Sequence, residues 1–78
     1  MNTAIQRAEL RSTALARAEY DASSAQLLLD FHDGSCYVYS GLPTSVFTDL
    51  LHAPSQGTFF NREIRDRYEQ VRIAEPEN

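Results

Sequence analysis

Two tyrosines, Tyr37 and Tyr39, stand two residues apart in a run of strand-forming residues. Side chains two apart on a β-strand project from the same face of the sheet. Aromatic rings exposed on a sheet stack on unpaired bases, and each contact contributes about 1–3 kcal/mol. The pair therefore indicates a surface for single-stranded nucleic acid.

Arginine is concentrated in the segment 61–72, which holds four of the seven arginines in a chain that contains no lysine. Its guanidinium suits planar contacts with phosphates and bases. Arg62 and Arg65 are candidate phosphate contacts, and Asn61 could hydrogen-bond a base edge. The candidate binding residues are Tyr37, Tyr39, Asn61, Arg62 and Arg65.

The same residues also fit a purely structural interpretation. Tyrosine is common in strands and could pack beneath a helix or a partner chain. The arginines have acidic neighbours at helical spacing, as in Arg62 with Asp66 and Glu63 with Arg67. Charge alone favours this second interpretation, so the side of the sheet that the helices cover is decisive.

The sequence gives little indication of a catalytic site or a metal site. Cys36 and His32 are expected on opposite faces of a hairpin, and His52 lies near the end of a helix. Asp30, His32 and Asp33 are close in sequence, but the turn requires Asp33 and the set lacks metal-ligand spacing. We expect no enzyme, no metal and no cofactor.

Length and charge limit the possibilities further. The chain has 78 residues and a formal net charge of −4, which indicates one small domain and disfavours a general phosphate binder. A single cysteine excludes an internal disulfide. No signal sequence or membrane-spanning run is visible, so a cytoplasmic protein with no membrane association is expected.

The elements that must position these residues follow from local pattern. Residues 13–20 alternate weakly and predict a strand, and residues 26–40 predict a hairpin about Asp33-Gly34. Asp-Gly favours a two-residue type I′ turn, which would pair Leu29 with Val38. One face would then hold the apolar core, and the other face would carry both tyrosines. The core face comprises Leu27, Leu29, Phe31, Cys36 and Val38.

Two helices are expected after the hairpin. Pro43 begins the first, which carries an apolar stripe and ends before Pro54, and Ser55 is the N-cap of the second. The fold class is α+β: an antiparallel three-stranded β-meander, two helices packed on one face, and the run 71–73 as an optional short final strand. The expected core residues are Leu29, Phe31, Val38, Phe47, Leu50, Leu51, Phe60 and Ile64.

The order of these motifs resembles the KTSC domain family. The shared features are Asp33-Gly34, the central Tyr37-Val38-Tyr39, Leu42-Pro43, the small-residue turn 53–57, and Phe60-Asn61 with Ile64-Arg65. The resemblance covers about residues 12–73 and implies a single domain there. Local pattern predicts a tail or short helix at 1–11 and a disordered acidic tail at 74–78. The family occurs in small bacterial and phage proteins and as an appendage of some lysyl-tRNA synthetases, and an RNA-binding role has been suggested for it.

We therefore expect a small non-enzymatic module that binds RNA or single-stranded nucleic acid through Tyr37, Tyr39 and the arginine-bearing helix. The alternative is a protein-interaction module or homodimer that uses the same face, because tyrosine and arginine are favoured at interface hot spots. An open sheet edge would serve the same purpose.

Overall fold

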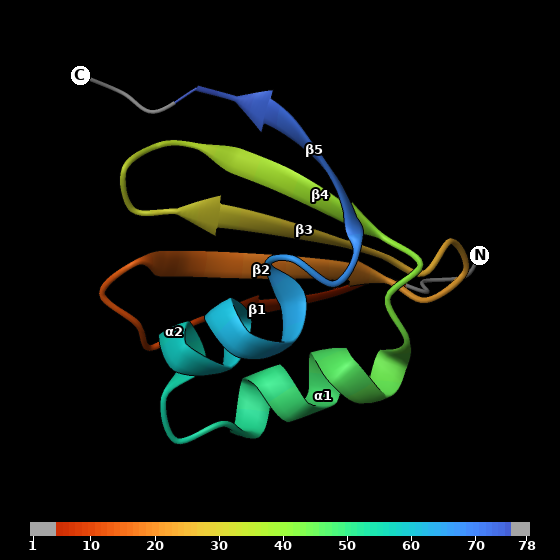
Figure 1. Cartoon of the computed structure of the whole chain (residues 1–78), viewed down its shortest axis with the longest axis horizontal. Helices are drawn as coiled ribbons and strands as arrows, with labels where there is room; N and C mark the ends of the chain where they lie inside the picture. The colour runs from red at the N-terminus through yellow and green to blue at the C-terminus, as the bar shows by residue number, and fades with distance from the viewer. Residues whose placement is uncertain (1–4, 76–78) are drawn as a thin grey trace.

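A five-stranded antiparallel sheet forms the centre of the computed structural model, which describes residues 5–75 (Figure 1). The strands lie in chain order across the sheet. Their bounds are β1 Ile5–Glu9, β2 Leu15–Asp21, β3 Gln26–Phe31, β4 Cys36–Ser40 and β5 Glu69–Ala74.

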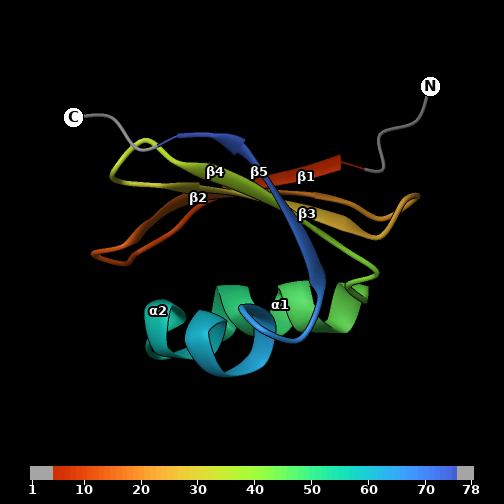
Figure 2. The ribbon, with the colours of Figure 1, turned by 45° about the horizontal axis from the view of Figure 1, so that its top comes forward.

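Both helical segments lie on one face of this sheet, and within residues 5–75 no helix or strand covers the other face (Figure 2). The α-helix α1 spans Thr44–His52, and a second segment consists of the short α-helix α2, Gln56–Phe59, and a π-helical turn η1, Phe60–Ile64. After η1 the chain returns to the sheet and pairs β5 with β4. Sheet and helices thus form two layers with the core between them.

The expectation of a three-stranded meander is wrong, because the sheet has five strands. The optional strand over 71–73 is present within β5. Ile5–Glu9 is a strand paired with β2 rather than a tail or short helix. Residues 1–4, and residues 76–78 of the expected acidic tail, lie outside the described part of the chain.

The expected hairpin register is also wrong, by one residue. Leu29 pairs with Tyr37, and Leu28 pairs with Val38. The loop has three residues, His32 to Gly34, and Phe31 N donates to Ser35 O at 2.9 Å. Gly34 has a φ of 93°, as the last residue of a three-residue loop requires. Asp-Gly marked the turn correctly but not its length.

A one-residue change of register exchanges the two faces of a strand. Tyr37 and Tyr39 therefore lie on the core face beneath the helices, where Tyr39 is only 2% exposed. Val38 is half-buried on the opposite face, so its expected core position is incorrect. Cys36 is buried on that outer face too, opposite Asp30.

The core between the two layers is built mainly from large apolar and aromatic side chains. Leu29, Phe47, Leu50, Phe60 and Ile64 are buried as expected, whereas Phe31 and Leu51 are half-buried. The other buried core residues are Leu10, Leu15, Ala18, Tyr20, Leu27, Tyr39 and Leu42.

Tyr20 fastens the start of α1 to the sheet. Its hydroxyl donates to Leu42 O at 2.6 Å, and its ring stacks on Phe47 with centroids 5.0 Å apart. Ser55 caps α2 by accepting a hydrogen bond from Thr58 N at 3.3 Å. These contacts fix the distance between the helices and the sheet, and with it the shape of the space between them.

Candidate functional site

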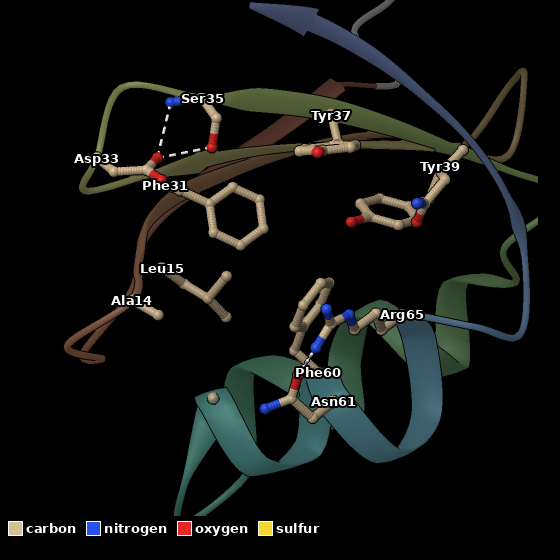
Figure 3. Close-up of a pocket in the computed structure, with 12 residues that line it drawn as sticks. Ala14, Leu15, Phe31, Asp33, Ser35, Tyr37, Tyr39, Phe60, Asn61 and Arg65 are labelled. Carbon is tan, nitrogen blue, oxygen red and sulfur yellow. Dashed lines mark hydrogen bonds between the residues drawn. The ribbon is translucent and has the colours of Figure 1, made fainter. Parts of the chain in front are cut away.

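A cleft of about 360 Å³ opens between the sheet and the second helical segment (Figure 3). This volume is near the lower end of the range for small-molecule sites. The lining residues are Ala14, Leu15, Phe31, Asp33, Ser35, Tyr37, Tyr39, Gly57, Phe60, Asn61, Arg65 and Gln70.

Four aromatic rings make up much of this lining. Phe31 meets Tyr37 edge-on with centroids 5.8 Å apart, and Phe60 meets both Phe31 at 5.5 Å and Tyr39 at 5.8 Å. Tyr37 and Tyr39 stack at 6.2 Å. Phe31 and Tyr37 are half-buried residues that line the cleft, whereas Tyr39 is buried and packs against Tyr37 and Phe60.

The Tyr39 phenol is held in its neutral form. Its pKa is raised to about 12, mainly by burial; neighbouring Tyr37 and Asp66 contribute to this rise, and Arg65 opposes it. Desolvation disfavours the phenolate because a buried charge loses its hydration. Tyr39 therefore contributes an uncharged ring to the cleft.

The π-helical turn η1 places the helical side of the cleft. Arg65 N donates to Phe60 O at 2.9 Å, a bond that spans five residues instead of four. Such turns are rare and occur frequently at functional sites. The wider turn carries Phe60, Asn61 and Arg65 at the cleft, and Arg65 Nη1 donates to Asn61 Oδ1 at 3.4 Å.

Arg65 is available to a ligand. Within residues 5–75 the ion pairs join Arg7 to Glu19 and Arg72 to Glu75, and no carboxylate lies at ion-pair distance from Arg65. The internal pairing of Arg62 with Asp66, which the structural interpretation suggested, is not among these pairs either. The guanidinium of Arg65 is exposed and held only by its bond to Asn61.

An acidic group enters the cleft from the hairpin loop. Asp33 Oδ1 accepts hydrogen bonds from Ser35 N at 2.9 Å and from Ser35 Oγ at 2.6 Å (Figure 3). These bonds lower the pKa of Asp33 below its ordinary value, because they favour the ionised form. The cleft thus contains one fixed carboxylate and one guanidinium.

The structure brings most of the sequence-predicted residues together. Tyr37, Tyr39, Asn61 and Arg65 all line the cleft. Arg62 lies elsewhere, in a shallow hollow with Pro54 and Phe59. Tyr39 is buried, so its ring is not exposed for stacking on a base as the sequence had predicted.

Sequence reasoning missed Phe31, Asp33, Ser35 and Gln70 as cleft residues. Phe31 was expected in the core, and Asp33 was explained completely by its turn. The spacing of Asp33 and Ser35 could have indicated this site, because an aspartate side chain often accepts a hydrogen bond from the backbone N–H two residues further on. Gln70 depends on the pairing of β5 with β4, which local pattern did not reveal.

The residues first considered for catalysis have structural partners. His32 Nε2 lies 3.1 Å from Ser12 O, and His52 Nδ1 lies 2.9 Å from Thr48 O. The pKa of the Cys36 thiol is raised to about 12, mainly by burial and in smaller part by the hydrogen bond and charge of Asp30 and the charge of Glu19. This thiol is therefore protonated at neutral pH and a weak nucleophile.

Two further properties concern the described residues as a group. Between Ile5 and Glu75, histidine, cysteine and acidic side chains form no cluster of three or more that could hold a metal ion. In the same range, every helix is too short or too polar to cross a bilayer.

One antiparallel sheet with two short helical segments on one face defines a small two-layer α+β domain. The chain belongs to the KTSC domain family, whose model matches residues 11–68. A KTSC domain protein from Yersinia pestis, solved by crystallography, has the same fold with a TM-score of 0.82. It is 28% identical, and the match covers 90% of this chain and 99% of that one.

Relatives in sequence are of two kinds. A protein of Tsukamurella paurometabola is 38% identical over 64 residues, which are 82% of this chain and 96% of the relative. A lysine–tRNA ligase of Nostoc punctiforme is 34% identical over 55 residues, which are 70% of this chain. The match spans only 10% of that ligase, so the chain resembles a small part of it.

Proposed function

We propose that this domain is a non-enzymatic module that binds single-stranded RNA in the cleft between the sheet and η1. The observation that carries the proposal is the combination of half-buried aromatic rings with an unpaired arginine in one cleft. Phe31 and Tyr37 would stack on an unpaired base, Arg65 would contact a phosphate, and Asn61 would hydrogen-bond the ligand or orient Arg65.

Stacking rather than charge would supply most of the affinity. The chain carries a net charge of −4, and within the cleft Arg65 is balanced by Asp33. Base–aromatic stacking contributes about 1–3 kcal/mol per base and needs no net positive charge. Binding is therefore expected to be modest in affinity and to depend weakly on salt.

One further observation supports RNA as the ligand class. The lysine–tRNA ligase relatives carry a related segment within a protein whose name specifies an RNA substrate. This relationship is an association, and the aromatic cleft remains the physical basis of the proposal. We place the protein in the cytoplasm, where RNA is available.

Arg65→Ala and Arg62→Ala form a matched pair for testing this site, because Arg62 lies outside the cleft. Binding of a fluorescently labelled single-stranded RNA is measured by anisotropy at several salt concentrations. One phosphate contact predicts a log–log salt slope of about −0.7 for the wild type. Arg65→Ala should weaken binding and move the slope towards zero, whereas Arg62→Ala should change neither.

The proposal fails if the wild type binds no single-stranded RNA at low salt. It also fails if both arginine variants lose affinity equally, because affinity would then come from diffuse charge rather than from the cleft. Thermal unfolding of each variant checks that the fold is intact.

A homodimer is the second candidate function, favoured by an apolar row on the uncovered face of the sheet. Leu28, Val38 and Val71 are direct partners across β3, β4 and β5, and Val71 is 62% exposed. A soluble antiparallel sheet normally carries polar residues on such a face. This apolar face is opposite to the face that carries Tyr37 and Tyr39, which the sequence had suggested as the dimer contact.

A second copy of the chain is the occupant that the charges fit. Arg17 and Asp21 flank Glu19 on β2, and Glu19 is the direct partner of Leu28 in the apolar row. A two-fold axis along this row would place Arg17 of each copy against Asp21 of the other. The contact would be isologous, as in most dimers.

Sedimentation of Val71→Glu and Gln70→Glu tests the dimer. Both variants add one negative charge to β5, but Gln70 lies on the cleft face and Val71 on the outer face. The wild type and Gln70→Glu should sediment as dimers and Val71→Glu as a monomer. A monomeric wild type, or equal behaviour of the two variants, would exclude this interface.

A further inference from the structure

The carboxylate of Asp33 has no role in stacking or in phosphate binding. A group that repels phosphate is nevertheless part of a cleft that also contains Arg65. In Figure 3 Asp33 and Arg65 lie towards opposite ends of the aromatic lining, one on the hairpin loop and the other on the helical side. A ligand that spans the cleft would meet an anion at one end and a cation at the other.

The hydrogen bonds of Asp33 leave part of its carboxylate free. Ser35 N and Ser35 Oγ both donate to Oδ1, and Oδ2 has no such partner among the described residues. Ser35 is itself buried, with 6% of its surface exposed, so the carboxylate is fixed in position. An ionised carboxylate accepts hydrogen bonds and cannot donate them.

Bases differ in what they offer to such an acceptor. Cytosine, adenine and guanine each carry an exocyclic amino group, and a carboxylate accepts from the cytosine amino group in known recognition pairs. Uracil presents a carbonyl oxygen in the place of the cytosine amino group. Its single ring N–H lies between two carbonyl oxygens, which would face the carboxylate and repel it.

We propose that Asp33 selects unpaired bases that carry an exocyclic amino group, so that the cleft discriminates against uracil. This inference rests on the proposed RNA-binding function and adds a specificity-determining residue to it. The base would lie on Phe31 and Tyr37 with its amino edge towards Asp33, and its phosphate would reach Arg65. The volume of about 360 Å³ suits one such unit better than a run of bases.

Hexacytidylate and hexauridylate provide the matched ligands. They differ only at the 4-position, an amino group in cytosine and a carbonyl oxygen in uracil, and at the adjacent ring nitrogen, which carries a hydrogen only in uracil. Anisotropy competition against one labelled RNA measures both affinities for the wild type and for Asp33→Asn. Asparagine preserves the turn, since both residue types bond the backbone two positions on. Its amide can also donate, so it tolerates the uracil carbonyl.

The wild type should bind hexacytidylate about tenfold more tightly than hexauridylate, the size of one good hydrogen-bonded base contact. Asp33→Asn should remove most of this preference. Asp21→Asn is the control, because Asp21 makes the same two bonds to Ser23, at 2.9 and 2.6 Å, outside the cleft. It should keep the wild-type preference.

Equal affinity of the wild type for the two RNAs, or a preference that survives Asp33→Asn, overturns the assignment of Asp33. If the RNAs bind equally and Arg65→Ala weakens both, the RNA-binding cleft stands and only the base selection fails. If neither RNA binds at low salt, the proposed function and this inference fail together.

Discussion

Tyr37 and Tyr39 occupy neighbouring positions on one face of β4, yet their surroundings differ. Tyr39 is almost fully buried against Phe60, whereas Tyr37 lies half-buried at the cleft. One tyrosine can therefore meet a ligand, and the other supports the first. Residue type and spacing selected the pair, but only the packing of the helices distinguishes their roles.

Tyr37 gives the residue-scale prediction. Tyr37→Phe keeps the ring and should bind RNA like the wild type. Tyr37→Ala removes the stacking surface and should weaken binding by about 1–3 kcal/mol, measured by anisotropy at low salt.

Tyr68→Ala is the control for this series, because Tyr68 is also half-buried but does not line the cleft. Wild-type affinity in Tyr37→Ala, or an equal loss in Tyr68→Ala, contradicts stacking at Tyr37.

At the scale of elements, the hairpin between β3 and β4 determines which residues face the cleft. The sequence located its turn from Asp33-Gly34, and both helices and the Ser55 cap were also predictable from proline, capping and apolar spacing. The loop length was not, because Asp-Gly fits both a two-residue and a three-residue loop. The three-residue loop is selected because it buries Tyr39 beside Leu27 beneath the helices. This is a tertiary effect that local sequence does not show.

The π-helical turn is a second feature beyond local prediction. Phe60 and Ile64 have ordinary helical spacing, and nothing in their types indicates a bond that spans five residues. Asn61 and Arg65 were each named as candidate binding residues, and the structure joins them by a hydrogen bond, because residues four apart lie on one face of a helix.

Gly34 gives the prediction at this scale. A β-branched residue resists the positive φ of this position, so Gly34→Val should lower the free energy of unfolding by about 1–3 kcal/mol. Urea unfolding measures the change.

Gly57→Ala is the matched control, because a Cβ there would lie 3.4 Å from Ser12 Oγ, an ordinary contact. Alanine also favours a helix more than glycine does, so this variant should be as stable as the wild type or slightly more so. Unchanged stability in Gly34→Val would contradict the observed loop.

At the scale of the whole molecule, the two layers enclose a small core built mostly from leucine and aromatic side chains. The sequence indicated an α+β domain correctly but missed β1. Ile5–Glu9 pairs only with β2 and is mostly exposed, so it shows little of the alternation that marks a half-buried strand. β5 is also exposed along most of its length, so its sequence likewise shows little alternation.

Alkaline pH should destabilise the molecule as a whole. The pKa values of Cys36 and Tyr39 are both raised to about 12, from ordinary values of 9.0 and 10.0. The folded state keeps these protons where the unfolded state loses them, so stability is fully present below pH 9 and falls as the pH rises towards 12.

Urea unfolding in the presence of reductant at pH 8 and at higher pH measures this effect. Cys36→Ala should lose the part of the decline that begins near pH 9. Stability that rises with pH across this range would contradict the burial of both groups.

The central claim is that the cleft, and not the uncovered face of the sheet, contacts RNA. The most direct test is a titration of the ¹⁵N-labelled chain with hexacytidylate, followed by ¹H–¹⁵N correlation spectra. The account predicts that the backbone amides of Phe31, Tyr37, Asn61 and Arg65 shift, while those of Val71 and Ile73 do not. Shifts confined to Val71, Ile73 and their neighbours on the outer face, or no shifts at all, would contradict it.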